Sequence, residues 1–378
     1  MLRPNRAALI GLARYRPRPL SPPACPETPC PIRSSAIVTS PSEACLLVPG
    51  LAEARPFTDA AGRRVEVPER ITRVLAAGPP AAVLLYTLAP GKMVGWPRAP
   101  SPEEKAFLSP DTRDLPAYGR LTGRGNTANV EAVLALKPDL IIDVGSVGPT
   151  YASLADRVQA QTGIPYLLLD GSFKATPETY RSLGALIGTE TEAEALAGEA
   201  DRILKAVAEA VAAVPEEKRP RVYYGRGPRG LETGLAGSIN TEIIEAAGGR
   251  NVAAAGAGGL ASVSPEQVLV WNPDIVIALD PGFPKAAAAD PFWSGLKAVR
   301  EGRVHAAPTL PFGWIDAPPG VNRLIGLRWL AGLFFPERFS QTLGDAVRDF
   351  YRRFYRVELE PAQLDRLLRE AAGPGPTR

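Results

Sequence analysis

Two glutamates occupy the same place in two copies of one sequence motif. Residues 129–143 read Asn-Val-Glu-Ala-Val-Leu-Ala-Leu-Lys-Pro-Asp-Leu-Ile-Ile-Asp, and residues 264–278 read Ser-Pro-Glu-Gln-Val-Leu-Val-Trp-Asn-Pro-Asp-Ile-Val-Ile-Ala. The copies align without a gap, 135 positions apart, and place Glu131 opposite Glu266. A carboxylate at this position can simply favour the start of a helix, whose dipole attracts negative charge. Its recurrence also allows one symmetric role for both copies.

Groups that could hold a metal or act as a nucleophile are sparse. The single histidine, His305, falls in a predicted strand, where a structural role is the simpler interpretation. All three cysteines precede residue 46, so the rest of the chain offers no disulfide framework and no cysteine-based metal site. Residues 225–230 match a dinucleotide fingerprint, but Pro and Arg stand where its helix should begin. We therefore expect a binding protein rather than an enzyme, without catalytic residues, metal ligands or a cofactor of its own.

Length and charge narrow the class of protein further. A chain of 378 residues exceeds one typical hydrophobic core, so two lobes or domains are expected. A net charge of +3 gives no case for a nucleic-acid partner. No apolar run reaches the roughly 18 residues that a membrane-spanning helix requires.

Each copy of the motif predicts a short helix, a Pro-Asp turn and a buried strand. Asn129 and Ser264 can cap the two helices, and the prolines of the turns end them. The apolar runs 140–142 and 275–277 are typical of strands covered on both faces, as in a parallel sheet. The motif therefore predicts two related α/β lobes.

The middle of the chain predicts one long helix. Thr191 and Glu194 have the spacing of a capping box, and apolar residues follow at helical spacing to about Val214. Roughly 24 residues give about 36 Å, which is long enough to bridge two lobes. Elsewhere we expect a hairpin at 57–68, short strands at 71–76 and 93–96, and a last helix at 340–355.

The first 54 residues do not predict a folded element. They are rich in Pro, Arg and Ser, and residues 44–54 resemble the tail of an export signal. Ala52-x-Ala54 would suit cleavage before Arg55. Disorder and a misassigned start are the alternatives, and residues 1–54 are left out of the expected fold.

Five motifs occur in an order that is characteristic of one family. They are Arg70-Ile-Thr-Arg-Val, the two copies above, Gly248-Gly-Arg-Asn-Val and Gly302-Arg-Val-His. Residues 56–356 resemble the periplasmic substrate-binding proteins of ABC importers for iron chelates (siderophores) and cobalamin, the helical-backbone metal-receptor type. The resemblance implies an α/β fold with two Rossmann-like lobes, central β-sheets, one bridging helix and a ligand cleft between the lobes. The expected parts are a leader or disordered segment 1–54, an N-terminal lobe 55–188, a bridging helix 189–216 and a C-terminal lobe 217–373.

The resemblance also implies partners and a location. Such proteins are exported to the periplasm or the extracytoplasmic face, act as monomers and deliver their ligand to an ABC permease dimer with its ATPase. By position, Glu131 and Glu266 would pair with arginines on the two permease subunits. The two-fold symmetry of that partner supplies a physical reason for the internal repeat.

The expected ligand lies where loops follow the strands. Arginines and aromatic residues in these loops suit an anionic, planar or bulky ligand. The expected ligand-binding residues are Pro79, Trp96, Arg98, Arg120, Ser146, Tyr224, Arg226, Arg229 and Trp314. A ferric siderophore-like chelate is the first hypothesis, and molybdate or tungstate, cobalamin and haem are alternatives. A chelatase-like enzyme on a related two-lobed scaffold is the other class.

Overall fold

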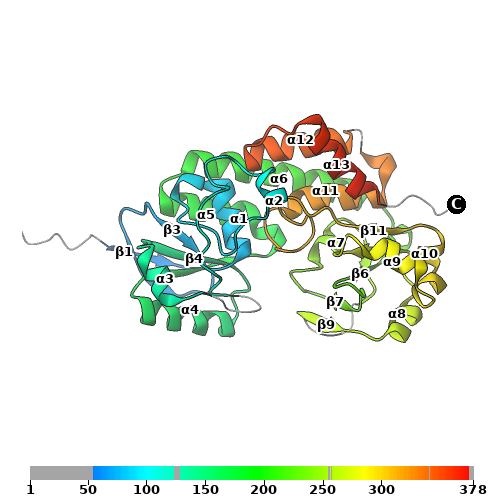
Figure 1. Cartoon of the computed structure of the whole chain (residues 1–378), viewed down its shortest axis with the longest axis horizontal. Coiled ribbons are helices and arrows are strands. Elements are labelled where there is room, and N and C mark those ends of the chain that lie inside the picture. The colour runs from blue at the N-terminus through cyan, green and yellow to red at the C-terminus, as the bar shows by residue number, and fades with distance from the viewer. Residues whose placement is uncertain (1–53, 123–127, 254–255, 257, 340, 374–378) are drawn as a thin grey trace, which may run out of the picture. The chain divides into compact units, whose positions relative to one another are not determined.

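The computed structural model describes residues 54–122, 128–253, 256, 258–339 and 341–373. These residues belong to one compact unit with two parallel β-sheets surrounded by helices (Figure 1). The sheet orders are β3-β4-β5 and β11-β10-β6-β8, and every strand pair within them is parallel. The expected α/β fold with two sheet-centred lobes is confirmed.

The parallel strands are β3 (Val74–Ala76), β4 (Leu140–Gly145), β5 (Tyr166–Asp170), β6 (Arg221–Gly225), β8 (Arg250–Asn251), β10 (Ile275–Ala278) and β11 (Val304–Ala306). Two antiparallel pairs join β1 (Ala54–Thr58) to β2 (Arg64–Pro68) and β7 (Glu232–Gly234) to β9 (Leu260–Ser262). The first pair is the expected hairpin, with Gly62 at a positive φ of 77° in its turn.

Helices cover both sheets. Those in the first half are α1 (Pro79–Leu88), α2 (Pro102–Lys105), α3 (Val130–Ala135), α4 (Pro149–Thr162), α5 (Thr176–Ile187) and α6 (Glu190–Ala212). Those in the second half are α7 (Glu242–Ala246), α8 (Pro265–Trp271), α9 (Phe283–Ala289), α10 (Lys297–Arg300), α11 (Arg323–Phe334), α12 (Leu343–Phe350) and α13 (Pro361–Ala372). The 23 residues of α6 give the expected long helix, about 35 Å at 1.5 Å per residue.

Three local expectations were wrong. Residues 93–96 form only isolated bridges, from Met93 to Val74 and from Trp96 to Ala117. The capping box does not form, because α6 already begins at Glu190 and Glu194 instead pairs with Arg181 of α5 at 2.8 Å. The helix at 340–355 is not the last, since α13 follows it with a capping box of its own.

The two copies of the motif adopt the same local structure. Asn129 Oδ1 accepts from the amide of Glu131 at 2.8 Å, and Ser264 Oγ accepts from the amide of Gln267 at 3.2 Å. Both helices end at a non-glycine residue with positive φ, Lys137 at 46° and Asn272 at 39°. The repeat therefore extends to an unfavourable backbone conformation that few residues other than glycine adopt.

The same hydrogen bonds attach each helix–strand unit to its sheet. Asp139 accepts from the backbone amide of Arg73 at 2.8 Å, and Asp274 accepts from that of Arg221 at 3.0 Å. The guanidinium of Arg73 donates to the carbonyl of Leu136 at 2.7 Å, and that of Arg221 donates to the matching carbonyl of Trp271 at 2.5 Å. The Pro-Asp turn is thus an anchor that fixes the helix relative to the neighbouring strand.

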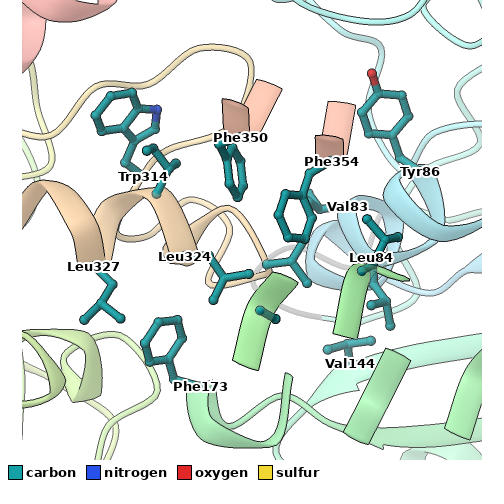
Figure 2. Packing of buried hydrophobic residues seen from close by; sticks show 14 of the residues in the cluster. Val83, Leu84, Tyr86, Val144, Phe173, Trp314, Leu324, Leu327, Phe350 and Phe354 are labelled. Carbon is teal, nitrogen blue, oxygen red and sulfur yellow. The ribbon is translucent and has the colours of Figure 1, made fainter. Parts of the chain in front are cut away.

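One hydrophobic core is shared by both sheets. Side chains from one face of each sheet, such as Ile142 of β4 and Ile277 of β10, belong to a single buried cluster with α1, α5, α6, α11 and α12. Figure 2 shows part of this cluster, which we call the spine core. The opposite faces of the sheets have separate cores, one containing Val133 of α3 and the other containing Val268 of α8.

Residues 355–366 pack against α1 and α2. The hydroxyl of Tyr86 in α1 donates to the carbonyl of Tyr355 at 2.7 Å, and Arg356 donates to the carbonyl of Thr87 at 2.7 Å. Arg366 of α13 pairs with Glu103 of α2 at 2.6 Å. Residues 343–372, which were expected to belong to the second lobe, therefore also contact helices of the first.

Arg323 of α11 connects segments that belong to the two sheets. Its side chain is 1% exposed, and its guanidinium donates to the carbonyls of Gly171 and Ile239, both at 2.8 Å. It also pairs with Glu242 at 2.6 Å, and the same Glu242 oxygen accepts from the amide of Phe173 at 2.8 Å. Burial lowers the pKa of Arg323, and Glu242 opposes this effect.

We expect Arg323→Met to lower the free energy of unfolding by about 3 kcal/mol, because it removes the cation that pairs with Glu242 and donates to the carbonyls of Gly171 and Ile239. Urea denaturation followed by circular dichroism measures the change. Arg366→Met is the matched control, since its exposed pair with Glu103 should contribute less than about 1 kcal/mol. Equal losses in the two variants would contradict a structural role for Arg323 between the sheets.

Candidate ligand-binding site

A cavity of about 510 Å³ lies among loops from both halves of the chain. Its volume is in the usual range for small-molecule sites, roughly 300–1,000 Å³. Part of its wall comes from the ends of parallel strands and the residues after them, such as residues 143–146 and Arg226, where α/β proteins commonly bind ligands. The lining residues are Pro79, Pro80, Arg98, Arg120, Thr122, Asp143, Val144, Gly145, Ser146, Tyr151, Arg226, Ile239, Asn240, Leu260, Asp316, Ala317, Pro318 and Pro319.

The first wall combines prolines, small residues and arginines. Pro79 begins α1 directly after β3, and Ser146 follows the end of β4. Arg98 is held by Glu104, with both guanidinium nitrogens bonded to the carboxylate at 2.7 and 2.8 Å. Because this pair is bidentate, the Arg98 guanidinium has a fixed plane at the cavity.

A buried carboxylate, Asp143 near the end of β4, also lines this wall. It accepts from the hydroxyls of Thr122 and Tyr166, both at 3.1 Å, and from the amide of Val144 at 3.0 Å. Burial raises the pKa of Asp143 to about 6, although all three hydrogen bonds oppose this shift. The cavity therefore contains a carboxyl group that changes its charge in mildly acidic solution.

The second wall is organised around Asp316. Its carboxylate accepts from the hydroxyl of Tyr224 at 3.1 Å and from the side-chain amide of Asn240 at 2.9 Å. Arg226 Nε lies 2.9 Å from Asp316 Oδ2, an ion pair without the angle of a hydrogen bond, and Arg226 also bonds to Glu232 at 2.9 Å.

Two carboxylates thus hold the Arg226 guanidinium in place. Burial alone would lower the pKa of Arg226, but the nearby Asp316 and Glu232 outweigh it, and the net shift is upward. Arg226 therefore presents a permanent, oriented cation to the cavity.

The structure brings together five of the nine expected ligand-binding residues. Pro79, Arg98, Arg120, Ser146 and Arg226 line the one cavity. They come from both halves of the chain, so each half supplies arginine to the same space.

The structure places the two expected tryptophans elsewhere, and this is a correction. Trp314 is 0% exposed and donates from Nε1 to the hydroxyl of Tyr351 at 3.3 Å. Its loop packs directly onto α11 at Gly326, where a side chain would collide with the Trp314 carbonyl. Trp96 is also buried and donates from Nε1 to the carbonyl of Thr112 at 2.8 Å. Both indoles are packing residues.

The structure also leaves Tyr224 and Arg229, two further expected ligand-binding residues, out of the cavity lining. Tyr224 is buried in β6 and reaches the cavity only through its bond to Asp316. Arg229 is exposed in the loop after β6 and does not line the cavity.

Sequence reasoning missed several polar cavity residues, among them Asp143, Asp316 and Asn240. Asp143 interrupts an apolar run, and its counterpart in the second copy of the motif is Ala278, so the departure from the repeat was a usable signal. Asp316 and Asn240 lie in loops where no pattern distinguishes them.

Glu131 and Glu266 lie outside the cavity and are exposed at the starts of α3 and α8. Within the described residues neither carboxylate has an ion-pair partner. Hydrogen bonds from its own amide and from the Ser264 hydroxyl lower the pKa of Glu266, so this carboxylate is ionised at neutral pH.

Other expectations concern metal ligands and membrane spans. In the part of the chain that the structure describes, no three His, Cys, Asp or Glu side chains are grouped so that they could hold a metal ion. Among the same residues, no helix combines the length and apolarity needed to cross a bilayer. His305 lies in β11 away from the cavity, and burial lowers its pKa.

Known proteins are similar to this chain in both sequence and fold. Residues 79–309 match the model of a family described as periplasmic binding protein. The molybdate-binding protein MolA of Haemophilus influenzae is 27% identical over 337 residues, which cover 81% of this chain and 92% of MolA. The high-affinity heme uptake protein IsdE of Staphylococcus aureus is 24% identical over 244 residues, 57% of this chain and 82% of IsdE.

One solved structure is similar to this chain over nearly the whole length of the solved protein. The ABC transporter solute binding protein from Sulfurospirillum deleyianum is 32% identical with a TM-score of 0.76, and the match covers 83% of this chain and 98% of that protein. The family match spans more than half of the chain, and this structural match covers most of it. The chain therefore belongs to the periplasmic binding protein family.

Proposed function

We propose that this protein is an extracytoplasmic solute-binding protein that captures an anionic, metal-containing solute and delivers it to an ABC importer. The observation that carries this proposal is the convergence of Arg98, Arg120 and Arg226 on one cavity built by both halves of the chain. Guanidinium groups recognise oxyanions and carboxylates by paired hydrogen bonds. The relatives are binding proteins of transporters, which supports capture of a solute rather than its conversion.

Within this class we favour a tetrahedral oxyanion, molybdate or tungstate. The support is the similarity to MolA, named as molybdate-binding, over 92% of its length. Donors held in one orientation, such as Arg226 between its two carboxylates, suit a small anion that must be held without rearrangement.

A ferric siderophore-like chelate is the second candidate. A cavity of about 510 Å³ is larger than one tetrahedral anion needs, and a chelate with anionic groups would fill more of it. Haem is a further probe because of the similarity to IsdE, and cobalamin completes the set of solutes to be tested.

Delivery requires contact with the importer, and we propose Glu131 and Glu266 as the docking residues. Both are exposed, both begin the same helix of a repeated unit, and the anchors at Asp139 and Asp274 orient these helices alike. Two matching carboxylates suit a permease with two equivalent basic sites.

The first prediction of this proposal concerns ligand affinity. Arg120→Gln should weaken binding about tenfold or more, because it removes a charged donor from the cavity. Isothermal titration with molybdate, tungstate, a ferric siderophore, haem and cobalamin measures the change. Arg229→Gln is the matched control, since Arg229 is exposed outside the cavity, and its affinity should equal that of the wild type. Failure of every solute to bind would refute the proposed function.

The second prediction concerns pH. The Asp143 carboxylate repels an anion when ionised, and its pKa is about 6. Molybdate affinity should therefore rise as pH falls from 7.5 to 5, by about tenfold if the repulsion is ~1.4 kcal/mol. Titrations at the two pH values test this, and Asp143→Asn should bind with nearly constant affinity. An unchanged pH profile in that variant would show that another group titrates.

The third prediction concerns delivery. Reversing both charges, Glu131→Arg with Glu266→Arg, should leave solute affinity unchanged and lower ATP-driven uptake into proteoliposomes about tenfold, because two basic sites would then face arginines. The control reverses two exposed glutamates outside the motif, Glu216→Arg with Glu217→Arg. Normal uptake with the doubly reversed motif would rule out the docking assignment.

A further inference from the structure

Two exposed leucines repeat together with the docking glutamates. The exposed large apolar side chains among the described residues are Leu134 at 42%, Tyr151 at 40%, Leu269 at 42% and Val270 at 78%. Tyr151 lines the cavity, whereas the other three lie on α3 and α8. Leu134 and Leu269 hold the same position of the two motif copies and have the same exposed fraction.

These leucines share a helix face with the glutamates. Leu134 follows Glu131 by three residues, and Leu269 follows Glu266 by three, a spacing that makes side chains neighbours on a helix surface. Val270, four residues after Glu266, extends the second face, where the first copy has Ala135.

Packing inside the protein does not explain these leucines. The same helices already bury Val133 and Val268 fully against their own sheets, so the inward position of each helix is filled. One exposed leucine on a surface is ordinary. Two at equivalent positions, each three residues after an exposed glutamate, form a repeated surface of the same chemistry.

Resting on the proposed docking role of the glutamates, we propose that each docking site is a combined polar and apolar contact. Glu131 with Leu134 forms one contact unit, and Glu266 with Leu269 and Val270 forms the other. The partner is a two-fold symmetric membrane permease that presents, on each subunit, a basic side chain next to an apolar socket. Negative charge in both units favours such a basic protein surface over the anionic surface of a membrane.

The two parts of each unit have separate tasks. The carboxylate attracts the basic partner and sets orientation, and its contribution falls as salt screens it. The leucine removes apolar surface from water, and its contribution persists in salt. The larger second unit makes the two contacts unequal, because Val270 exposes apolar surface that Ala135 does not supply.

The test measures binding of the full chain to the host's permease–ATPase complex in lipid nanodiscs by surface plasmon resonance. Leu134→Asn with Leu269→Asn should weaken binding at least tenfold, at both 0.1 M and 1 M salt. Leu134→Met with Leu269→Met is the matched control and should bind within about twofold of the wild type. Thermal melting and solute titration should be unchanged in both variants, because neither position lines the cavity or a core.

A parallel variant separates this inference from the proposed function. Glu131→Gln with Glu266→Gln should weaken binding at 0.1 M salt and much less at 1 M, where the screening length is about 3 Å. If the glutamine variant is impaired and the asparagine variant binds normally, the apolar contact is refuted while the docking glutamates stand. Wild-type binding to empty nanodiscs, or no binding to the permease, refutes both.

Discussion

The buried guanidinium of Arg323 sets the distance between the two walls of the ligand cavity. One of its bonds reaches the carbonyl of Gly171, whose amide in turn donates to the carbonyl of Gly145 at 3.0 Å. Another reaches the carbonyl of Ile239. Gly145 and Ile239 both line the cavity, and they come from different halves of the chain. The cation is buried at a cost that only its several acceptors and Glu242 offset, so its geometry permits little variation.

The spine core adds a second restraint on the same walls. Each sheet gives one face to this common cluster, in which α6, α11 and α12 also pack. Protein interiors are close-packed, so rotating one sheet against the other would require many side chains to move together. We therefore expect the cavity to be largely formed before a ligand arrives, and closure to be a small motion rather than a wide hinge opening. The oriented arginines of the walls belong to the same preformed arrangement.

Much of the scaffold is predictable from sequence because the repeat reports on local structure. The caps, the helix ends and the buried strands of both copies follow from residue types within fifteen positions. Contacts between segments that are far apart in the sequence could not be predicted from these local patterns. Arg73 and Arg221 play equivalent roles, yet they lie 66 and 53 positions from the aspartates that bind their amides, so an ungapped comparison misses them. Trp314 was assigned to the ligand from its flanking prolines, whereas its backbone packs against Gly326 of α11.

The return of the C-terminal helices to α1 has a consequence for the order of folding. The hydrogen bond between Tyr86 and Tyr355 joins residues 269 positions apart, and α13 reaches back to α2 through Arg366. Such long-range closure is entropically costly and slow. Helix α1 packs on β3, β4, α5 and α6 from the first half, but its contacts with residues 351–356 form only once those residues have been synthesised. Part of the packing of the first half must therefore wait until most of the second half has been synthesised.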